Sequence, residues 1–423
     1  MRAIQDLRVG WFVGIVGACL LTAGVARADV TTERPGSILI FPKVVNDGTR
    51  TTIIQITNTG NSPDEAQCFY INGTPDATGT PSCSEVDFFI ALTRQQPTHF
   101  DVATGRTFTS IMNGVDSAGI PPGQIPPVPT SFEGALVCTE IDSGGVPVAR
   151  NQLKGEATII GSAGNPVDAS KYNAIAVQGA TNGELDGGPT EAALALDGLQ
   201  YNACPATNVL NMIPGGAPDP VVAAIGNSGI CSSSGAPCGA TLTCPLPAGV
   251  CAAGTCTNGV PGTCVMDSDC AETCNTGLSA VGTNLTVLPC SLDLVGATTP
   301  VVTLNYVAFD EFETRTSGGF SFRCWGTFDL SAIIRTTSFA GGGSFANVQI
   351  SPAPGSSPVV GVAEMFHTDS LNNSGAAAVN LHTEGICNNA MGTGSLTSCT
   401  TTADCPSGET CGGLPSVIRV PIE

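Results

Sequence analysis

The residues with the clearest potential for chemistry are two glutamates and two histidines near the C-terminal end of the chain. Glu364 lies three residues before His367, and His382 lies two residues before Glu384. Residues two apart on a strand point to the same face of a sheet. If strands ending at 367 and starting at 378 form a hairpin, two imidazoles and two carboxylates converge, a ligand set suited to zinc or iron. Alternatively, these are polar strand ends that are solvated or cap backbone groups.

Motifs of the common enzyme classes are missing from the sequence. There is no phosphate-binding GxxxxGK, no dinucleotide-binding GxGxxG after a strand, no haem-attaching CxxCH and no zincin HExxH. We therefore expect a non-enzymatic surface or matrix protein that binds a protein or glycan partner, and we assign no catalytic or cofactor-binding residue. The alternative is a metal-assisted hydrolase that uses the Glu/His cluster at 364–384.

Twelve of the 19 cysteines fall into three four-cysteine units. The first two units lie in 225–279 and the third lies in 386–413. Cys231, Cys238, Cys244 and Cys251 have the spacing C-x6-C-x5-C-x6-C, Cys256, Cys264, Cys270 and Cys274 have C-x7-C-x5-C-x3-C, and Cys387, Cys399, Cys405 and Cys411 have C-x11-C-x5-C-x5-C. Zinc ligands usually come as closer pairs in a reducing compartment, which favours disulfides over metal.

The other cysteines support the same interpretation. Cys19 belongs to the leader, so 18 cysteines remain, and we expect all of them to be oxidised. Six of these lie outside the units among strand-like segments and should cross-link a β framework: Cys68, Cys83, Cys138, Cys204, Cys290 and Cys324. Each unit is too short to bury a core, so its disulfides would have to stabilise it.

The central C-x5-C of each unit reads CGATLTC, CVMDSDC and CTTTADC. Over 231–274 and 387–411 these spacings resemble the small cysteine-rich modules, similar to Dickkopf or EB modules, that are inserted in exported bacterial proteins. The resemblance implies no catalytic residues. The unit at 386–413 separates NLHTE, which ends at 384, from VIRVPIE, which starts at 417, and these segments would otherwise form a hairpin.

The first 28 residues predict a secretory signal peptide. Arg2 and Arg8 precede an apolar run from Trp11 to Ala23, and Ala26-Arg27-Ala28 fits a signal-peptidase site. A lipoprotein box at 16–19 and a retained anchor are the alternatives, but the apolar run is shorter than the roughly 20 residues that a spanning helix needs. We expect a secreted, periplasmic or cell-surface protein without a transmembrane segment in the mature chain.

Charge limits the class of partner. Loss of the leader changes the formal net charge from −20 to −22, because it removes three arginines and one aspartate. Such an acidic chain repels phosphate backbones, so we expect no nucleic-acid partner. The carboxylates either keep the protein soluble or hold calcium.

Strand-like segments bounded by Gly, Pro, Asn or Asp recur along the chain and predict an all-β fold of antiparallel sandwiches with disulfide-rich insertions. They lie at 36–45, 52–57, 85–92, 134–141, 155–160, 173–177, 301–315, 320–330, 359–366, 378–384 and 417–423. The segment 191–199 is expected to form a short helix. The predicted domains are a β-sandwich at 29–224, the insertion 225–279, and a second β domain or second half of the framework at 280–423, interrupted by 386–413.

Two further resemblances concern the strands. TIIQITNTGNSP at 52–63 is similar to the strand-and-turn openings of bacterial immunoglobulin-like surface domains, which implies an immunoglobulin-like character. ERPGSILIFPKVV after the leader, with the later VAEMFH and NLHTE, resembles exported β-rich proteins of Gram-negative bacteria. This resemblance implies export and no particular chemistry.

Overall fold

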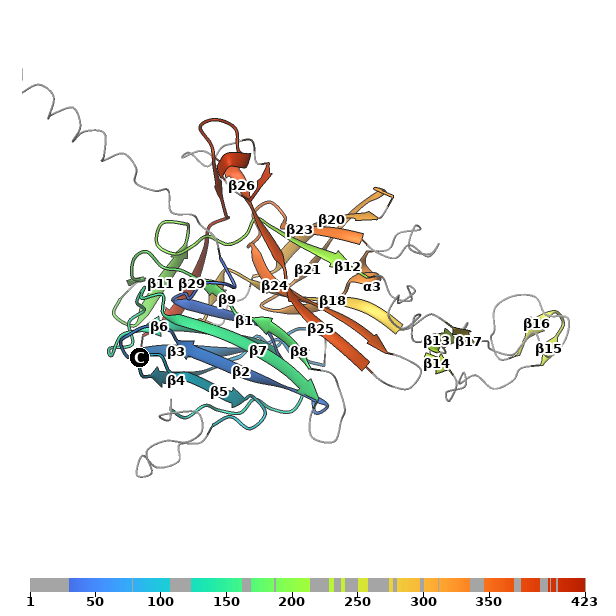
Figure 1. Cartoon of the computed structure of the whole chain (residues 1–423), viewed down its shortest axis with the longest axis horizontal. Helices are drawn as coiled ribbons and strands as arrows, with labels where there is room; N and C mark the ends of the chain where they lie inside the picture. The colour runs from blue at the N-terminus through green and yellow to red at the C-terminus, as the bar shows by residue number, and fades with distance from the viewer. Residues whose placement is uncertain are drawn as a thin grey trace, which may run out of the picture.

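The computed structural model describes residues 30–77, 79–106, 123–161, 169–185, 188–213, 228–231, 237–239, 250–257, 274–276, 280–296, 300–310, 312–334, 346–368, 374–388, 395, 397–400 and 402–422. Strands dominate the described part, and two short helices, α3 (Leu330–Ile333) and η4 (Thr402–Asp404), lie among them (Figure 1). The predicted all-β fold with antiparallel sheets is confirmed. No helix among the described residues is both long enough and apolar enough to cross a membrane.

The N-terminal strands form a nine-stranded sheet around one core. The order is β4 (Glu85–Leu92), β3 (Asp64–Asn72), β6 (Phe132–Ile141), β1 (Ile38–Asn46), β2 (Arg50–Asn58), β7 (Leu153–Gly161) and β8 (Ser170–Asn173), with β5 (Pro97–Asp101) on β2 and β9 (Ile175–Val177) on β1. β1 and β2 are joined by the register pair Asn46↔Thr51. The strands that pair with β1 and those that pair with β2 both contribute side chains to the core. Among the core residues are Phe41, Ile54 and Tyr70.

Two further sheets enclose another core. One sheet has the order β21 (Arg315–Phe322), β20 (Val302–Asp310), β23 (Ala346–Pro352), β12 (Thr207–Met212), β26 (His382–Asn388) and β27 (Ser398–Cys399), with β28 (Thr410–Gly412) on β26. The other has β22 (Gly326–Asp329), β18 (Ala280–Pro289), β24 (Val359–Thr368) and β25 (Ser374–Asn380). Alternating side chains such as Leu210, Leu285 and Val348 fill the space between them.

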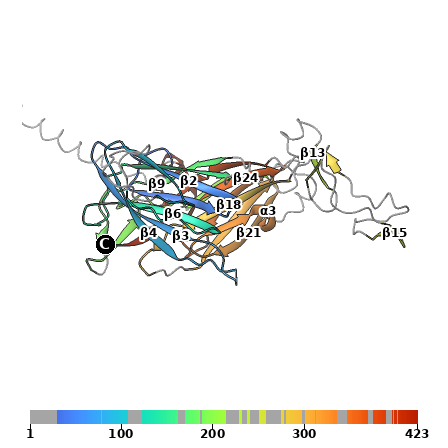
Figure 2. The ribbon, with the colours of Figure 1, turned by 90° about the horizontal axis from the view of Figure 1, so that it is seen from below.

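A third hydrophobic cluster joins the N-terminal sheet to C-terminal strands. The four-stranded sheet β10 (Glu184–Leu185), β11 (Glu191–Leu196), β29 (Ser416–Pro421) and β19 (Leu292–Asp293) contributes Leu194 and Ile418, which share this cluster with Phe69 and Val137 of the first sheet. Seen from below, blue and orange strands lie side by side in one body (Figure 2). Of the described sheet pairings, β19 with β29 is parallel and the rest are antiparallel.

Short strands form parts of the first two cysteine units. β14 (Pro237–Gly239), β13 (Ser228–Cys231) and β17 (Cys274–Thr276) form one small sheet, and β15 (Cys251–Ala252) pairs with β16 (Thr255–Cys256). Cys251 and Cys256 are both disulfide-bonded.

The six framework cysteines form three disulfides, as predicted. Cys68–Cys138 joins directly paired residues of β3 and β6, Cys83–Cys324 spans 241 residues, and Cys204–Cys290 spans 86 residues. The C-terminal unit is closed by Cys387–Cys405 and Cys399–Cys411. Disulfides in this number are typical of extracellular and secreted proteins.

Two local predictions are wrong. The expected helix at 191–199 is strand β11, because alternate residues of EAALAL are buried and the strand pairs with β29 over its length. This tertiary pairing overrides the helix propensity of Ala and Leu. The expected hairpin between the segments ending at 384 and starting at 417 does not form, since β26 pairs with β12 and β29 pairs with β11. The predicted domain boundaries and immunoglobulin-like character stay predictions.

Candidate functional site

Glu364, one of the four predicted metal ligands, is the counter-ion of a buried lysine. Its carboxylate oxygen Oε2 contacts the Lys43 ammonium, and both side chains are 5% exposed. Ser170 donates a hydrogen bond to the other oxygen, Oε1, at 3.3 Å. The carboxylate therefore already has a cation and a hydroxyl as partners, in a place where water is excluded.

A β-bulge lies at Lys43 in β1, a strand that is buried along its whole length. The register between β1 and β6 shifts between Phe41 and Val44, and bulges of this kind redirect side chains. At the bulge, backbone groups of β1 form hydrogen bonds with side chains. Tyr172 accepts from the Lys43 N–H at 3.1 Å and donates to its carbonyl at 2.5 Å, while Trp325 Nε1 donates to the Pro42 carbonyl at 2.8 Å.

The other predicted ligands lie on two strands. The hairpin expected between strands ending at 367 and starting at 378 forms only in part, because β24 pairs with β25, which ends at Asn380, whereas His382 and Glu384 lie on β26 in the sheet of β12. β24 carries both Glu364 and His367, and the His367 side chain is outside the described part. His382 and Glu384 share a face of β26, with Nε2 and Oε1 3.9 Å apart, and the His382 side chain is exposed. The structure thus brings together His382 and Glu384, and it places Glu364 against Lys43. The four-residue metal site stays a prediction.

One cluster of potential metal ligands does converge, but its members are disulfide-bonded cysteines. Within the described ranges, the group of three or more His, Cys, Asp or Glu ligand atoms close enough to share an ion is Cys387, Cys399 and Cys405. All three sulfurs belong to disulfides, which cannot supply thiolate ligands.

A hollow follows β4, the edge strand of the nine-stranded sheet. It has a volume of about 600 Å³, which is within the range of ligand sites. It is lined by Glu65, Val86, Asp87, Phe88, Phe89, Ile90, Ala91, Gly123, Gln124, Pro126 and Ile141. We call this hollow the β4 groove.

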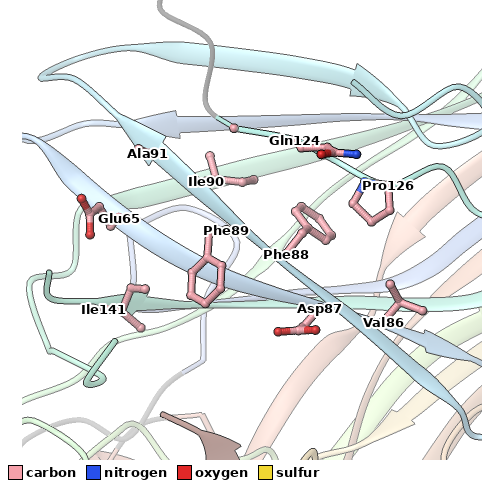
Figure 3. Close-up of a pocket in the computed structure, with 11 residues that line it drawn as sticks. Glu65, Val86, Asp87, Phe88, Phe89, Ile90, Ala91, Gln124, Pro126 and Ile141 are labelled. Carbon is pink, nitrogen blue, oxygen red and sulfur yellow. The ribbon is translucent and has the colours of Figure 1, made fainter. Parts of the chain in front are cut away.

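The two faces of β4 give the groove two walls of different character (Figure 3). Phe88 and Ile90 point toward Gln124 and Pro126, and both belong to the core of the N-terminal sheet. Phe89 and Asp87 point to the opposite face, as residues one position along a strand must. One wall is therefore apolar, and the other combines an aromatic ring with carboxylates.

The aromatic and acidic wall is built by cross-strand neighbours. Gln67 of β3 lies opposite Phe89, and Glu65 lies opposite Ala91. The Phe89 side chain is exposed for a large residue, at 39% of its surface, and it lies between Asp87 and Glu65 on this face. Gln67 is buried, and its Nε2 donates to Asp87 Oδ2 at 3.3 Å, which holds the carboxylate in place.

A further carboxylate, Glu85, extends this acidic wall along β4. Glu85 and Asp87 are two residues apart and share a face. Partial burial, together with the neighbouring Asp293 and Asp87 charges, raises the pKa of Glu85 to about 7. Its charge therefore changes in the neutral pH range.

Gly123 shapes the other side of the groove. A Cβ at this position would lie 2.8 Å from the Phe89 carbonyl oxygen, and the residue has φ +125. Both conditions require glycine, because a side chain would meet the edge strand and this φ is unfavourable for other residues. The segment from Gly123 to Pro126 therefore approaches β4 closely and lines the groove.

Sequence reasoning predicted the β4 strand at 85–92 but not the groove. Consecutive phenylalanines, Phe88 and Phe89, were the available signal, because one of two adjacent strand residues must leave the core. The pairing order that makes β4 an edge depends on contacts with β3, which was not predicted as a strand.

No protein-family model matches the sequence, and no curated protein matches it. Among solved structures, the chain is distantly similar to the viral chemokine binding protein R17 encoded by rodent gammaherpesvirus Peru. The identity is 7%, the match covers 84% of this chain and 87% of that chain, and the TM-score is 0.15. At this TM-score the likeness supports no inference about fold or function.

Proposed function

We propose that the chain is a secreted, non-enzymatic binding protein that holds a protein partner in the β4 groove, in the periplasm, at the cell surface or outside the cell. The observation that supports this proposal is an exposed phenylalanine, Phe89, between Asp87 and Glu65 in a hollow of about 600 Å³. Exposed aromatic residues in grooves are frequent anchors of protein recognition.

The composition of the groove favours a protein over a glycan. Most of its lining side chains are apolar, and those left at least partly exposed include Val86, Phe89 and Pro126. A partner gains by burying apolar side chains against such a wall, and peptides carry these side chains whereas glycans present hydroxyl groups.

The scaffold suits a binding role because it holds the groove rigidly. β4 is paired with β3 along its length, and β3 is linked to β6 by Cys68–Cys138. Cys83, directly before β4, is tied to Cys324. Little side-chain or backbone freedom is then lost on binding, which improves affinity for a given contact area.

Capture of extracellular material tests the proposal. The wild-type chain, Phe89→Ser and the matched control Phe312→Ser are immobilised and exposed to the extracellular fraction of the source cells. Phe312 is 76% exposed and lies outside the groove. We expect protease-sensitive material on the wild type and on Phe312→Ser, but not on Phe89→Ser. Equal capture by all three chains, or captured material that only glycosidases remove, would overturn the proposal.

A further inference from the structure

We infer that the acidic and aromatic wall of the β4 groove recognises a guanidinium group, so that the partner segment carries an arginine between apolar residues. This inference rests on the proposed function and specifies the partner of the same groove. It depends on the arrangement of Phe89, Asp87 and Glu65, together with the apolar wall behind them.

The ring of Phe89 provides a stacking surface for a planar cation. A cation over an aromatic face is attracted by the negative charge of the ring face, and arginine stacks in this way more often than lysine. Phe89 is partly exposed on the face that it shares with Asp87, so a side chain entering the groove reaches its ring.

Two carboxylates beside the ring supply acceptors for the N–H groups of the same cation. Asp87 is held by the buried Gln67, at 3.3 Å between Nε2 and Oδ2, so its orientation is set before a partner arrives. Glu65 belongs to the neighbouring strand and lines the groove from the other side of Phe89. The fork of guanidinium donors can bind one or both carboxylates, whereas an ammonium group acts as a point charge.

The apolar wall defines what surrounds the arginine. Val86 and Pro126 are at least partly exposed and lie on the opposite side of β4 from Asp87, next to the buried Phe88 and Ile90 (Figure 3). A segment crossing the groove therefore meets apolar surface next to the charged pocket, and valine or leucine beside the arginine would bury against it. A neutral or acidic segment can bury apolar side chains in the groove, but it lacks the cation that interacts with Phe89 and the carboxylates.

Charge also argues against a second copy of this chain as the occupant. Contact between two β4 grooves would bring Asp87, Glu65 and Glu85 of one copy close to the same residues of the other. Like charges placed together across an interface are unfavourable. The formal net charge of −20 adds a long-range repulsion between copies and an attraction for basic partners.

Short peptides test the inference directly. The probe is a fluorescein-labelled Gly-Val-Val-Arg-Val-Val-Gly peptide, and its analogues carry lysine, citrulline or glutamate at the centre. Citrulline keeps the planar shape and loses the charge. We expect affinity for the full chain to fall in the order arginine, lysine, citrulline, with no detectable binding of the glutamate peptide by fluorescence anisotropy.

Protein variants locate the site. Phe89→Leu keeps an apolar side chain without the ring, and Asp87→Asn keeps the hydrogen-bonding shape without the charge. Each should lower the affinity for the arginine peptide about two- to fivefold, as expected for loss of an exposed cation–π contact or ion pair. The matched controls Phe312→Leu and Glu33→Gln, both outside the groove, should leave affinity unchanged. Unchanged melting temperatures establish that the variants fold.

Equal affinity for the arginine and citrulline peptides, or insensitivity of arginine binding to Asp87→Asn, would overturn the inference. That outcome is distinguishable from failure of the proposed function. If Phe89→Ser still abolishes capture of a protein partner while arginine has no advantage, the groove binds protein and only the guanidinium assignment fails. Self-association of the chain that Phe89→Ser removes would contradict both.

Discussion

Lys43 and Glu364 are 321 residues apart in the sequence and form an ion pair in which each side chain is 5% exposed. Lys43 lies on β1 of the N-terminal sheet, and Glu364 lies on β24, which pairs with β18. The pair therefore connects two sheets that no short stretch of chain joins. A buried charge that loses its partner is strongly unfavourable, which makes this contact sensitive to substitution.

The first prediction concerns the stability that depends on this pair. Glu364→Gln or Lys43→Met alone should lower the free energy of unfolding by about 3–5 kcal/mol, since each leaves a buried group without its counter-ion. The double variant Lys43→Met with Glu364→Gln should lose less than the sum of the single variants. Chemical denaturation of oxidised protein measures all of these, and additive losses would show that the two residues are not coupled.

The second prediction concerns the segment 225–279, which contains the first two cysteine units. Described residues on either side of this segment are joined, because Ile213 N–H donates to Thr283 Oγ1 at 2.9 Å and this hydroxyl donates back to the Ile213 carbonyl at 3.2 Å. Replacement of 225–279 by a short Gly-Ser turn removes eight of the 18 cysteines that follow the leader and leaves ten. Since loop entropy grows slowly with length, the shortened chain should unfold cooperatively at a similar temperature.

Calorimetry of the shortened chain checks this prediction. A chain that has lost Thr283 Oγ1, through Thr283→Val in the same background, should be less stable, because the Ile213 N–H then lacks its partner. Loss of the cooperative transition on excision alone would show that 225–279 belongs to the core.

The third prediction concerns pH. The pKa of Glu85 is raised to about 7, chiefly by burial and also by Asp293 and Asp87. The folded state is therefore more stable while this carboxyl is protonated than when it is ionised. That contribution is lost as the pH rises through about 7. Ionisation adds a charge beside Asp87, and we expect the arginine peptide to bind about threefold more tightly at pH 8 than at pH 6.

The matched control for this pH effect is Glu85→Gln. In this variant the affinity should be flat between pH 6 and pH 8, and the wild-type difference should shrink at high salt, as for any exposed electrostatic interaction. A pH dependence that persists in Glu85→Gln would assign the effect to another group.

The sequence was sufficient for the fold class because its signals are local. Alternation and turn residues mark β4 and β6, and cysteine parity predicts the framework disulfides that the structure contains. The strand β3 was missed because DEAQCFYIN mixes charged residues with a continuous buried run, as a strand covered on both faces does. The metal hypothesis grouped Glu364 with nearby histidines, whereas its partner Lys43 is distant in sequence and lies on a strand of another sheet.

The central claim is that a protein partner contacts the β4 groove, and photo-cross-linking from position 89 tests it most directly. Benzoylphenylalanine replaces Phe89 in one chain and the exposed Phe312 in a second, and each is irradiated with the extracellular fraction. We predict a cross-linked protein adduct from position 89, with the link mapped by mass spectrometry to an arginine-containing segment of the partner, and no such adduct from position 312. Adducts of the same protein from position 312 but not from position 89 would contradict the account.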